Sequence, residues 1–419
     1  MPTASFELIR HLYERGLASV DPATVTKSAL ADLNTDTGKL IVLAIGKAAV
    51  PMAQAARDIY GDRIDAGLLV TKQGQYTAEV EGFVGIEAGH PVPNLPSLQA
   101  GELALDIVAD LTSGDTVLAL ISGGGSALME APVEGVSLAE LQVTTEMLMH
   151  AGADIYDLNT VRKTLSQIKG GGLRRAIGAA RCITLLLSDV LGNDRGVIAS
   201  GPTILESIDP ATDWKILKRH RVQDRVPESV LRVLQADPVP IEEVDTSRDI
   251  VDVIADNDTM IAAVAGAAES EGFTVQIAWP DWRGDARELG QRIVDDCLVS
   301  STDVLIGGGE ATCRVRGNGR GGRNSEAALI TALALRGNDE WTVASLASDG
   351  DDGNSHAAGA IIDGTIIDDA SAALAALEES NSAGYLSDRK ALLVPGPTGT
   401  NVNDIYIAVR RSAAEGGIA

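Results

Sequence analysis

Apolar residues come in short runs along the chain, and longer stretches with helical periodicity separate them. Most of these runs are apolar at every position, which is typical of parallel strands buried on both faces. They predict strands at residues 40–45, 67–71, 116–121, 182–187, 250–255, 273–278, 303–306, 342–347 and 391–394. The intervening patterns predict helices at residues 48–60, 97–111, 138–151, 285–300 and 324–336.

This alternation predicts an α/β fold of two domains, each with a largely parallel sheet flanked by helices. A chain of 419 residues is also long for a single core. Residues 205–248 carry four prolines, scattered charge and an acidic stretch, which makes them the best candidate for a linker. We therefore divide the chain near residue 240, into domains of residues 1–240 and 241–419.

The chain carries a formal net charge of −25 and has a pI near 4.5. Such an acidic surface repels nucleic acid and anionic membranes, so we expect neither as a partner. The acidic excess, with few lysines and few aromatic residues, resembles a halophilic protein from a high-salt cytoplasm. An acidic mesophilic enzyme is the alternative.

Three cysteines lie far apart in or beside apolar runs, and their spacing favours neither a metal site nor a disulfide framework. The first 17 residues are typical of an amphipathic helix rather than a signal peptide. No apolar run approaches the roughly 20 residues that a membrane span needs. We therefore expect a cytoplasmic protein.

In open α/β sheets, ligands bind beyond the carboxyl ends of the strands, so the residues after each apolar run are candidates. Lys47 follows the strand at 40–45, and a helix start there would attract anions; a surface lysine in a turn is the alternative. Ser122-Gly-Gly-Gly-Ser126 follows the strand at 116–121, and its backbone amides can close around a phosphate unless it is only a flexible turn. Asp189 follows the next strand, where it can bind Mg²⁺ or accept a hydroxyl proton.

The second half carries a similar set of strand-end residues. Gly309 and Glu310 follow the strand at 303–306, and residues 314–324 then hold four arginines among glycines. Arginine forks suit phosphate or carboxylate, whereas a solvated basic hairpin is the alternative.

Asp349 opens a segment with three carboxylates in four residues, directly after the strand at 342–347. Mg²⁺ is the natural partner for such a cluster, and an acidic surface turn is the alternative. Residues 396–404, which include Asn401 and Asp404, form a turn rich in hydrogen-bond donors and acceptors.

The sequence contains no GxxxxGK[ST], GxSxG or HExxH motif, which excludes a P-loop protein and gives no support to a serine hydrolase or a zinc peptidase. Its five histidines are dispersed. We interpret His90, in Gly-His-Pro-Val-Pro-Asn, as a turn residue rather than a catalyst.

An ordered series of motifs covers almost the whole chain. It comprises AIGKAA at 44–49, GHPVPN at 89–94, SGGGSAL at 122–128, NTVRKTLSQIKGGGL at 159–173, SDVLGND at 188–194, IASGPT at 198–203, GGGEAT at 307–312, GRGGRN at 319–324, SDGDDG at 348–353 and GPTGTNVND at 396–404. In this series the chain resembles the glycerate 2-kinase family, whose members have an N-terminal glycerate-kinase domain followed by a smaller C-terminal domain named after a MOFRL motif. The match departs at the linker and at Asn193, where the family more often has a second aspartate.

The resemblance implies transfer of a phosphoryl group from ATP to the 2-hydroxyl of D-glycerate, with Lys47, Asp189 and Arg323 as the catalytic residues. Candidate donors on both domains imply an active site in a cleft between them. We assign Mg²⁺ to Asp189 and Asp349. We assign nucleotide binding to Ser122, Gly123, Gly124, Gly125, Ser126, Gly309, Glu310, Asn401 and Asp404.

The main alternative is an NAD(P)H-dependent hydroxypyruvate reductase. Gly317, Gly319 and Gly322 satisfy GxGxxG ahead of a predicted helix, but no clear strand-end acid lies about 20 residues further on. A non-catalytic nucleotide-binding protein is a third hypothesis. Glycerate and ATP are the expected partners, and the oligomeric state is open, with a homodimer as one option.

Overall fold

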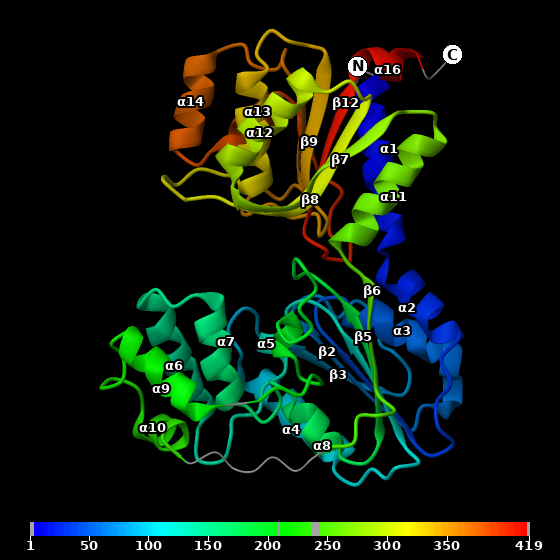
Figure 1. The fold of residues 1–419 in the computed structure, drawn as a ribbon, viewed down its shortest axis with the longest axis vertical. Coiled ribbons are helices and arrows are strands. Elements are labelled where there is room, and N and C mark those ends of the chain that lie inside the picture. The colour runs from blue at the N-terminus through cyan, green and yellow to red at the C-terminus, as the bar shows by residue number, and fades with distance from the viewer. Residues whose placement is uncertain (1–3, 208, 237–243, 417–419) are drawn as a thin grey trace. The chain divides into compact units, whose positions relative to one another are not determined.

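The computed structural model describes residues 4–207, 209–236 and 244–416, which form two compact units (Figure 1). The N-terminal unit comprises Pro22–Ser188 and Asn193–Ile254, and the C-terminal unit comprises Asp189–Gly192, the chain from Ala255 onwards and the N-terminal residues up to Asp21. The predicted division at residue 240 lies outside the described residues, so it stays a prediction. The N-terminal helix thus belongs to the same unit as the C-terminal half of the chain.

The N-terminal unit contains a six-stranded sheet and its covering helices. Its strands are β1 (Leu40–Ile45), β2 (Ala66–Lys72), β3 (Phe83–Ala88), β4 (Thr116–Ile121), β5 (Arg181–Leu187) and β6 (Ile250–Ala255). Its helices are α2 (Pro22–Ala31), α3 (Ala49–Tyr60), η1 (Gly61–Arg63), α4 (Leu95–Val108), α5 (Gly125–Leu128), α6 (Leu138–His150), α7 (Ile155–Thr164), α8 (Gly172–Ile177), η2 (Ile198–Ser200), α9 (Pro210–Arg219) and α10 (Glu228–Leu234).

The first sheet has the strand order β3-β2-β1-β4-β5-β6, and the four pairs from β3 to β5 are parallel, as the sequence predicts. Every residue of β1 and β4 is buried, which explains why both strands are apolar throughout. The strand β3 was not predicted, because this edge strand is largely exposed and carries no continuous apolar run.

Two hydrophobic clusters stabilise the N-terminal unit. In one, side chains of β1, β2 and β4 pack against α4 and α8. In the other, α6, α7, α9 and α10 pack together around residues such as Leu148, Val161 and Leu217. The second cluster is a helical layer with a core of its own. Its helices α6 and α7 precede β5 in the sequence, and α9 and α10 follow it.

The C-terminal unit also contains a six-stranded sheet. Its strands are β7 (Val275–Asp285), β8 (Val304–Thr312), β9 (Trp341–Ala347), β10 (Gly359–Asp363), β11 (Leu392–Leu393) and β12 (Asp404–Arg410). Its helices are α1 (Ala4–Ser19), α11 (Asn257–Ser270), α12 (Ala286–Val299), α13 (Arg323–Ala334), α14 (Ala370–Glu378), α15 (Ser382–Asp388) and α16 (Arg411–Gly416).

The α/β class with two sheets is confirmed, but the prediction that the second sheet is largely parallel was wrong. Its strand order is β11-β10-β9-β12-β8-β7, and of its five pairs only β7 with β8 is parallel. The connection explains the pair of β9 and β10, because β10 follows β9 with no helix between them. A parallel pair of consecutive strands would need a crossover of a dozen or more residues, usually helical.

Helices cover both faces of the second sheet (Figure 1). Side chains of α12, α13, α14 and α15 share the apolar core on one face. On the other face α1 and α11 pack together, and Tyr13 of α1 donates a 2.8 Å hydrogen bond to the carbonyl of Ala347. None of the helices in the described ranges is long and apolar enough to cross a membrane.

Asp213 of α9 is an acid buried in the helical layer of the N-terminal unit. Its Oδ2 accepts a 2.6 Å hydrogen bond from Thr164, whereas its Oδ1 has no hydrogen-bond partner among the described residues. Burial raises its pKa to about 7, with the Thr164 bond opposing the shift. The folded state therefore binds a proton that the unfolded state has already released between pH 4 and pH 7.

We predict that this carboxyl group makes the folded protein less stable as the pH rises through that interval, by up to about 1.4 kcal/mol per pH unit. The Asp213→Asn variant, which cannot ionise, should be more stable than the wild type at pH 8 and should differ little from it at pH 4.5. Urea unfolding followed by circular dichroism at both pH values measures the difference. An equal effect of the substitution at the two pH values would contradict the prediction.

Candidate active site

The strand order of the first sheet creates a switch point between β1 and β4. The chain runs outward from β1 to β2 and β3, and then returns to build β4 and β5 on the other side of β1. Because these strands are parallel, their carboxyl ends lie at one edge of the sheet, where ligands of open α/β folds bind. Lys47 follows β1 and the glycine loop (Ser122–Ser126) follows β4, so two predicted site segments meet there.

Two hydrogen bonds join these segments. The Lys47 amide donates to the carbonyl of Gly123 at 2.9 Å, and the Ala48 amide donates to the Ser122 hydroxyl at 3.0 Å. Ser122 is only 1% exposed, so its hydroxyl holds the two loops together. Its assignment to nucleotide binding stays a prediction.

Glycine is required in this loop for steric reasons. Gly124 has a φ of +85°, in the left-handed region, and an added Cβ would lie 3.2 Å from the His90 ring. A Cβ on Gly125 would lie 2.9 Å from the Cβ of Ala199. The loop is thus packed closely on both sides. The ring of His90, which we interpreted from the sequence as a turn residue, borders the loop at Gly124.

A chain of polar side chains continues from the glycine loop. The Ser126 and Ser200 hydroxyls lie 2.8 Å apart, and Ser200 donates to Asn159 of α7 at 3.3 Å. Both Ala199 and Ser200 have positive φ values, 51° and 61°, which non-glycine residues rarely adopt. Such strained backbone clusters at functional sites. Asn159 and Ser200 were not among the predicted site residues, although both lie in motifs of the family series.

Arg162 of α7 is a cation at the same loop that sequence reasoning missed. Its guanidinium donates to the Ser126 carbonyl at 3.2 Å, and no other hydrogen bond or ion pair of this side chain occurs within the described part of the chain. Burial lowers its pKa, opposed by Glu130. The Glu130 carboxylate is itself bonded to Lys169 in a fully buried ion pair and to Ser166. This buried group therefore carries a net positive charge beside the loop.

In the C-terminal unit, Arg323 and Asp404 form a bidentate ion pair. Arg323 is the first residue of α13, and its Nε and Nη2 donate to the two carboxylate oxygens at 2.6 and 2.9 Å. Asp404 is fully buried and also accepts a 3.0 Å bond from the Asn324 amide. Burial raises the pKa of Asp404, which Arg323 opposes. Burial lowers the pKa of Arg323, but the charges of Asp404 and Glu310 outweigh it and raise the pKa overall.

Several predicted segments converge at this pair. Asp404 begins β12 and lies opposite Gly309 of β8 and Ala347 of β9. Glu310 is about half exposed, with its Oε1 at 3.8 Å from Nη1 of Arg323. The Asn401 side chain accepts a 3.2 Å bond from the Asn403 amide, within the turn that leads into β12.

The acidic segment after β9 contains carboxylates in different environments. Asp352 is buried and accepts 2.8 and 2.9 Å bonds from the backbone amides of Asn324 and Ser325, so it caps the start of α13, and burial raises its pKa to about 6. Asp349 is half-buried, and its charge adds to burial in raising the pKa values of Tyr13 and Asp404. Both carboxylates therefore lie near the Arg323–Asp404 pair, but Asp352 is buried as a helix cap, whereas Asp349 is partly exposed.

Asp189, the other predicted metal ligand, is half-buried and clusters with the C-terminal unit. Within residues 4–207, 209–236 and 244–416, no three histidine, cysteine, aspartate or glutamate side chains gather as a metal site. The assignment of Mg²⁺ to Asp189 and Asp349 stays a prediction.

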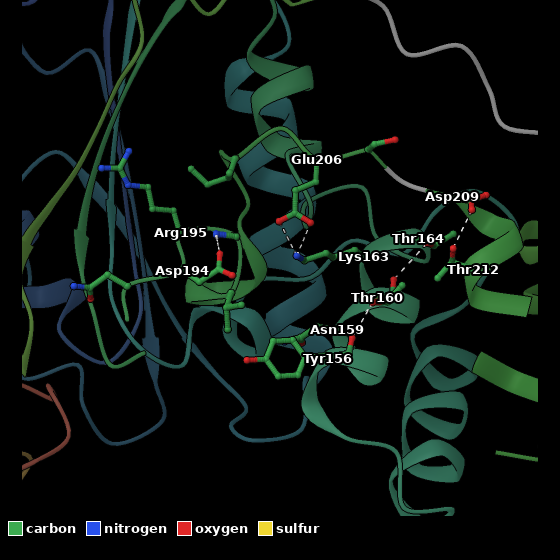
Figure 2. Close-up of a pocket in the computed structure, with 15 residues that line it drawn as sticks. Tyr156, Asn159, Thr160, Lys163, Thr164, Asp194, Arg195, Glu206, Asp209 and Thr212 are labelled. Atoms are coloured by element: carbon green, nitrogen blue, oxygen red, sulfur yellow. Dashed lines mark hydrogen bonds and ion pairs between the residues drawn. The ribbon is translucent and has the colours of Figure 1, made fainter. Parts of the chain in front are cut away.

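The N-terminal unit also contains a cavity of about 710 Å³ beside α7 (Figure 2). Lys163 and Glu206 form an ion pair in its wall, with both carboxylate oxygens 2.7 Å from the Lys163 ammonium, and Asn159 connects the wall to the polar chain of the glycine loop. None of the predicted catalytic or nucleotide-binding residues lines this cavity.

Comparisons with known proteins agree with this geometry. Residues 8–235 match the family model described as a domain of unknown function (DUF4147), and residues 303–404 match the MOFRL family. A protein from Thermotoga maritima named D-glycerate 2-kinase is 37% identical, over 97% of this chain and 99% of its own length. A glycerate 2-kinase from Pyrococcus horikoshii is 38% identical over 89% of this chain and 87% of its own, and a protein from Agrobacterium vitis named putative hydroxypyruvate reductase is 35% identical over 95% and 93%.

A crystal structure of a glycerate kinase from Thermotoga maritima superposes with a TM-score of 0.89 at 37% identity, and the match covers 96% of this chain and 99% of that one. The relatives and the two family models therefore span both units of the structure. The chain belongs to the glycerate 2-kinase family.

Proposed function

We propose that the protein is an ATP-dependent glycerate 2-kinase, which transfers the γ-phosphoryl group of ATP to the 2-hydroxyl of D-glycerate and forms 2-phosphoglycerate. The observation that carries the proposal is the joined pair of loops at the switch point, where Lys47 lies beside a glycine loop suited to phosphate. Full-length similarity to proteins named glycerate 2-kinase supports it.

We propose roles for the candidate catalytic residues from the charges of their side chains. Phosphoryl transfer needs positioning of the reactants and neutralisation of the charge on the transferred group. Lys47 and Arg323 would supply positive charge to the phosphoryl group or to the glycerate carboxylate, and Asp189 would orient or deprotonate the hydroxyl. The amides of Gly123, Gly124 and Gly125, with the Ser126 hydroxyl, would hold phosphate oxygens.

The residues of the C-terminal unit that we assigned to nucleotide binding differ in their exposure to solvent, and we propose different roles for them. Glu310 is half exposed, and we propose that it contacts the nucleotide together with Gly309 and Asn401. Asp404 is fully buried and bonded to two side chains, so we propose that it acts by fixing the Arg323 guanidinium.

We propose Mg²⁺ as the cation that accompanies ATP. In kinases this ion is usually held by one or two carboxylates and the substrate phosphates, and the carboxylates available here fit that pattern. Asp349, whose charge raises the pKa of buried Asp404, is one suitable ligand, and Asp189 is the other. Bound there, the ion would neutralise charge on the phosphates.

The reductase hypothesis loses support from the packing of its glycine motif. A Cβ on Gly317 or Gly319 would lie within 2.6 Å of Glu379 or Asn381, and a Cβ on Gly322 would lie 2.3 Å from Asp352. These glycines allow close packing within the unit, and their segment does not directly follow a strand as a dinucleotide fingerprint would.

The first prediction of the proposed function is that purified protein with ATP, Mg²⁺ and D-glycerate forms a product that enolase converts directly, without phosphoglycerate mutase. Excess EDTA should abolish the reaction. NADH oxidation with hydroxypyruvate, without ATP turnover, would favour the reductase instead.

We also propose that the acidic surface, with its net charge of −25, is an adaptation to high salt. The same assay in low and in molar KCl tests this, because a salt-adapted enzyme should be active only in the concentrated salt. Full activity in low salt would leave the mesophilic alternative.

The second prediction is that Lys47→Ala lowers kcat by about 100-fold or more while the urea midpoint stays unchanged, because the variant loses a positive charge that neutralises the transferred phosphoryl group. Lys39→Ala is the matched control, since Lys39 is exposed and precedes β1 at the opposite edge of the sheet. Near-normal turnover of the Lys47 variant would exclude its catalytic role and would suit a non-catalytic nucleotide-binding protein.

The third prediction concerns the geometry of Arg323. Lysine keeps the charge but cannot form the two-pronged contact with Asp404, so Arg323→Lys should lower kcat/KM by about 10-fold or more. Arg292→Lys, at an exposed pair with Asp296 on α12, should have no such effect. Equal kinetics of the two variants would show that only the charge at residue 323 matters.

A further inference from the structure

Three basic side chains follow three neighbouring strands at the carboxyl edge of the first sheet. Lys47 comes after β1, Lys72 is the last residue of β2, and His90 comes two residues after β3. The parallel register aligns Ile45 with Val70, and Lys72 with Ala88, so these three residues emerge at the same edge.

The loop that carries His90 folds toward the glycine loop. A Cβ placed on Gly124 would lie 3.3 Å from Nε2 of His90 and 3.4 Å from Cγ of Lys47, so both side chains border the same glycine. Asn94 fixes the loop, because its side chain accepts a 2.9 Å bond from the Gly89 amide and also caps α4. The imidazole is therefore positioned by a capped helix rather than by a mobile turn.

The structure gives the two ammonium groups no carboxylate partner among the residues that it describes. No hydrogen bond or ion pair of the Lys47 or Lys72 ammonium occurs among residues 4–207, 209–236 and 244–416. By contrast, Lys27, Lys163 and Lys169 are each paired with a carboxylate. Lys47 and Lys72 are thus two of only nine lysines in a chain with a net charge of −25, and the parallel register brings both to one sheet edge.

Glu87 carries the carboxylate next to these basic residues in the sheet, and it is hydrogen-bonded to backbone amides. Glu87 lies on β3 one position before the partner of Lys72, and its Oε1 accepts bonds of 2.7 and 3.2 Å from the backbone amides of Gly74 and Tyr76. Burial and the positive charges of Lys47 and Lys72 lower the pKa of His90, so the ring is neutral at neutral pH and retains one N–H to donate.

We propose that Lys72 and His90 complete, with Lys47, a binding site for one oxyanion of the reactants. Two ammonium groups and an imidazole N–H around a glycine suit a carboxylate or a phosphate, because charge-assisted hydrogen bonds to such groups are strong. The inference rests on the proposed function for the identity of the reactants. The oxyanion is either the carboxylate of glycerate or a phosphate of the nucleotide, and the two sources separate in the experiment.

The fourth prediction uses Lys72→Met, which removes the charge and keeps the length of the stem, with Lys39→Met as the matched control. Calorimetric titration with D-glycerate and, separately, with ADP measures equilibrium binding, and steady-state kinetics measures KM for D-glycerate and for ATP. The Kd and KM of at least one reactant should rise by about 10-fold or more in Lys72→Met, as expected for the loss of a charge-assisted contact. A rise for D-glycerate identifies the carboxylate, and a rise for the nucleotide identifies a phosphate.

Two further variants separate charge from packing. Lys72→Arg should restore most of the affinity, and His90→Gln should weaken binding of the same reactant as Lys72→Met. If Lys72→Met and His90→Gln both bind the two reactants as tightly as Lys39→Met does, the inference is wrong. If the wild type binds ADP or D-glycerate through Lys72 but forms no phosphoglycerate, the proposed function fails while the oxyanion site stands.

Discussion

The candidate site of the N-terminal unit depends on the two hydrogen bonds that join the loop after β1 to the loop after β4. They link strands that are neighbours in the sheet but more than seventy residues apart in the sequence, through the Gly123 carbonyl and the Ser122 hydroxyl. Together with the pairing of β1 and β4, which ends at Ile45 and Ile121, this link holds the backbone that presents Lys47 against the glycine loop. Because Ser122 is buried, the link is part of the core rather than of the solvent-exposed surface.

The basic side chains of the two candidate sites differ in whether a carboxylate of the protein pairs with them. In the C-terminal unit, Arg323 is bonded to buried Asp404, so its orientation is set before any substrate binds. In the N-terminal unit, the described residues give Lys47 and Lys72 no carboxylate partner, and Arg162 bonds only a carbonyl. The first arrangement suits a group that must point in one direction, and the second suits groups whose counter-ion arrives with the substrate.

The sequence predicted most strands of the first sheet closely, because β1 and β4 are buried on both faces and end at glycine-rich turns. It could not predict the antiparallel pair of β9 and β10 in the second sheet, since the direction of β10 depends on a connection without a helix and not on the composition of the strand. Strand ends also identified Lys47, the glycine loop and Arg323 as candidates. The sequence could not distinguish Asp349 from Asp352, because only packing against the start of α13 makes Asp352 a helix cap. The contact of His90 with Gly124 likewise depends on a loop that folds back over the sheet edge.

The most direct test of the proposed kinase activity is phosphorus NMR of the product formed from ATP and D-glycerate by the purified chain in concentrated KCl. Transfer to the 2-hydroxyl attaches the phosphate to a carbon with a single hydrogen, so we expect a doublet from the new phosphomonoester. A triplet would indicate the 3-hydroxyl, whose carbon carries two hydrogens, and would contradict the proposed regiochemistry. The absence of any new phosphomonoester signal would contradict the assignment as a glycerate kinase.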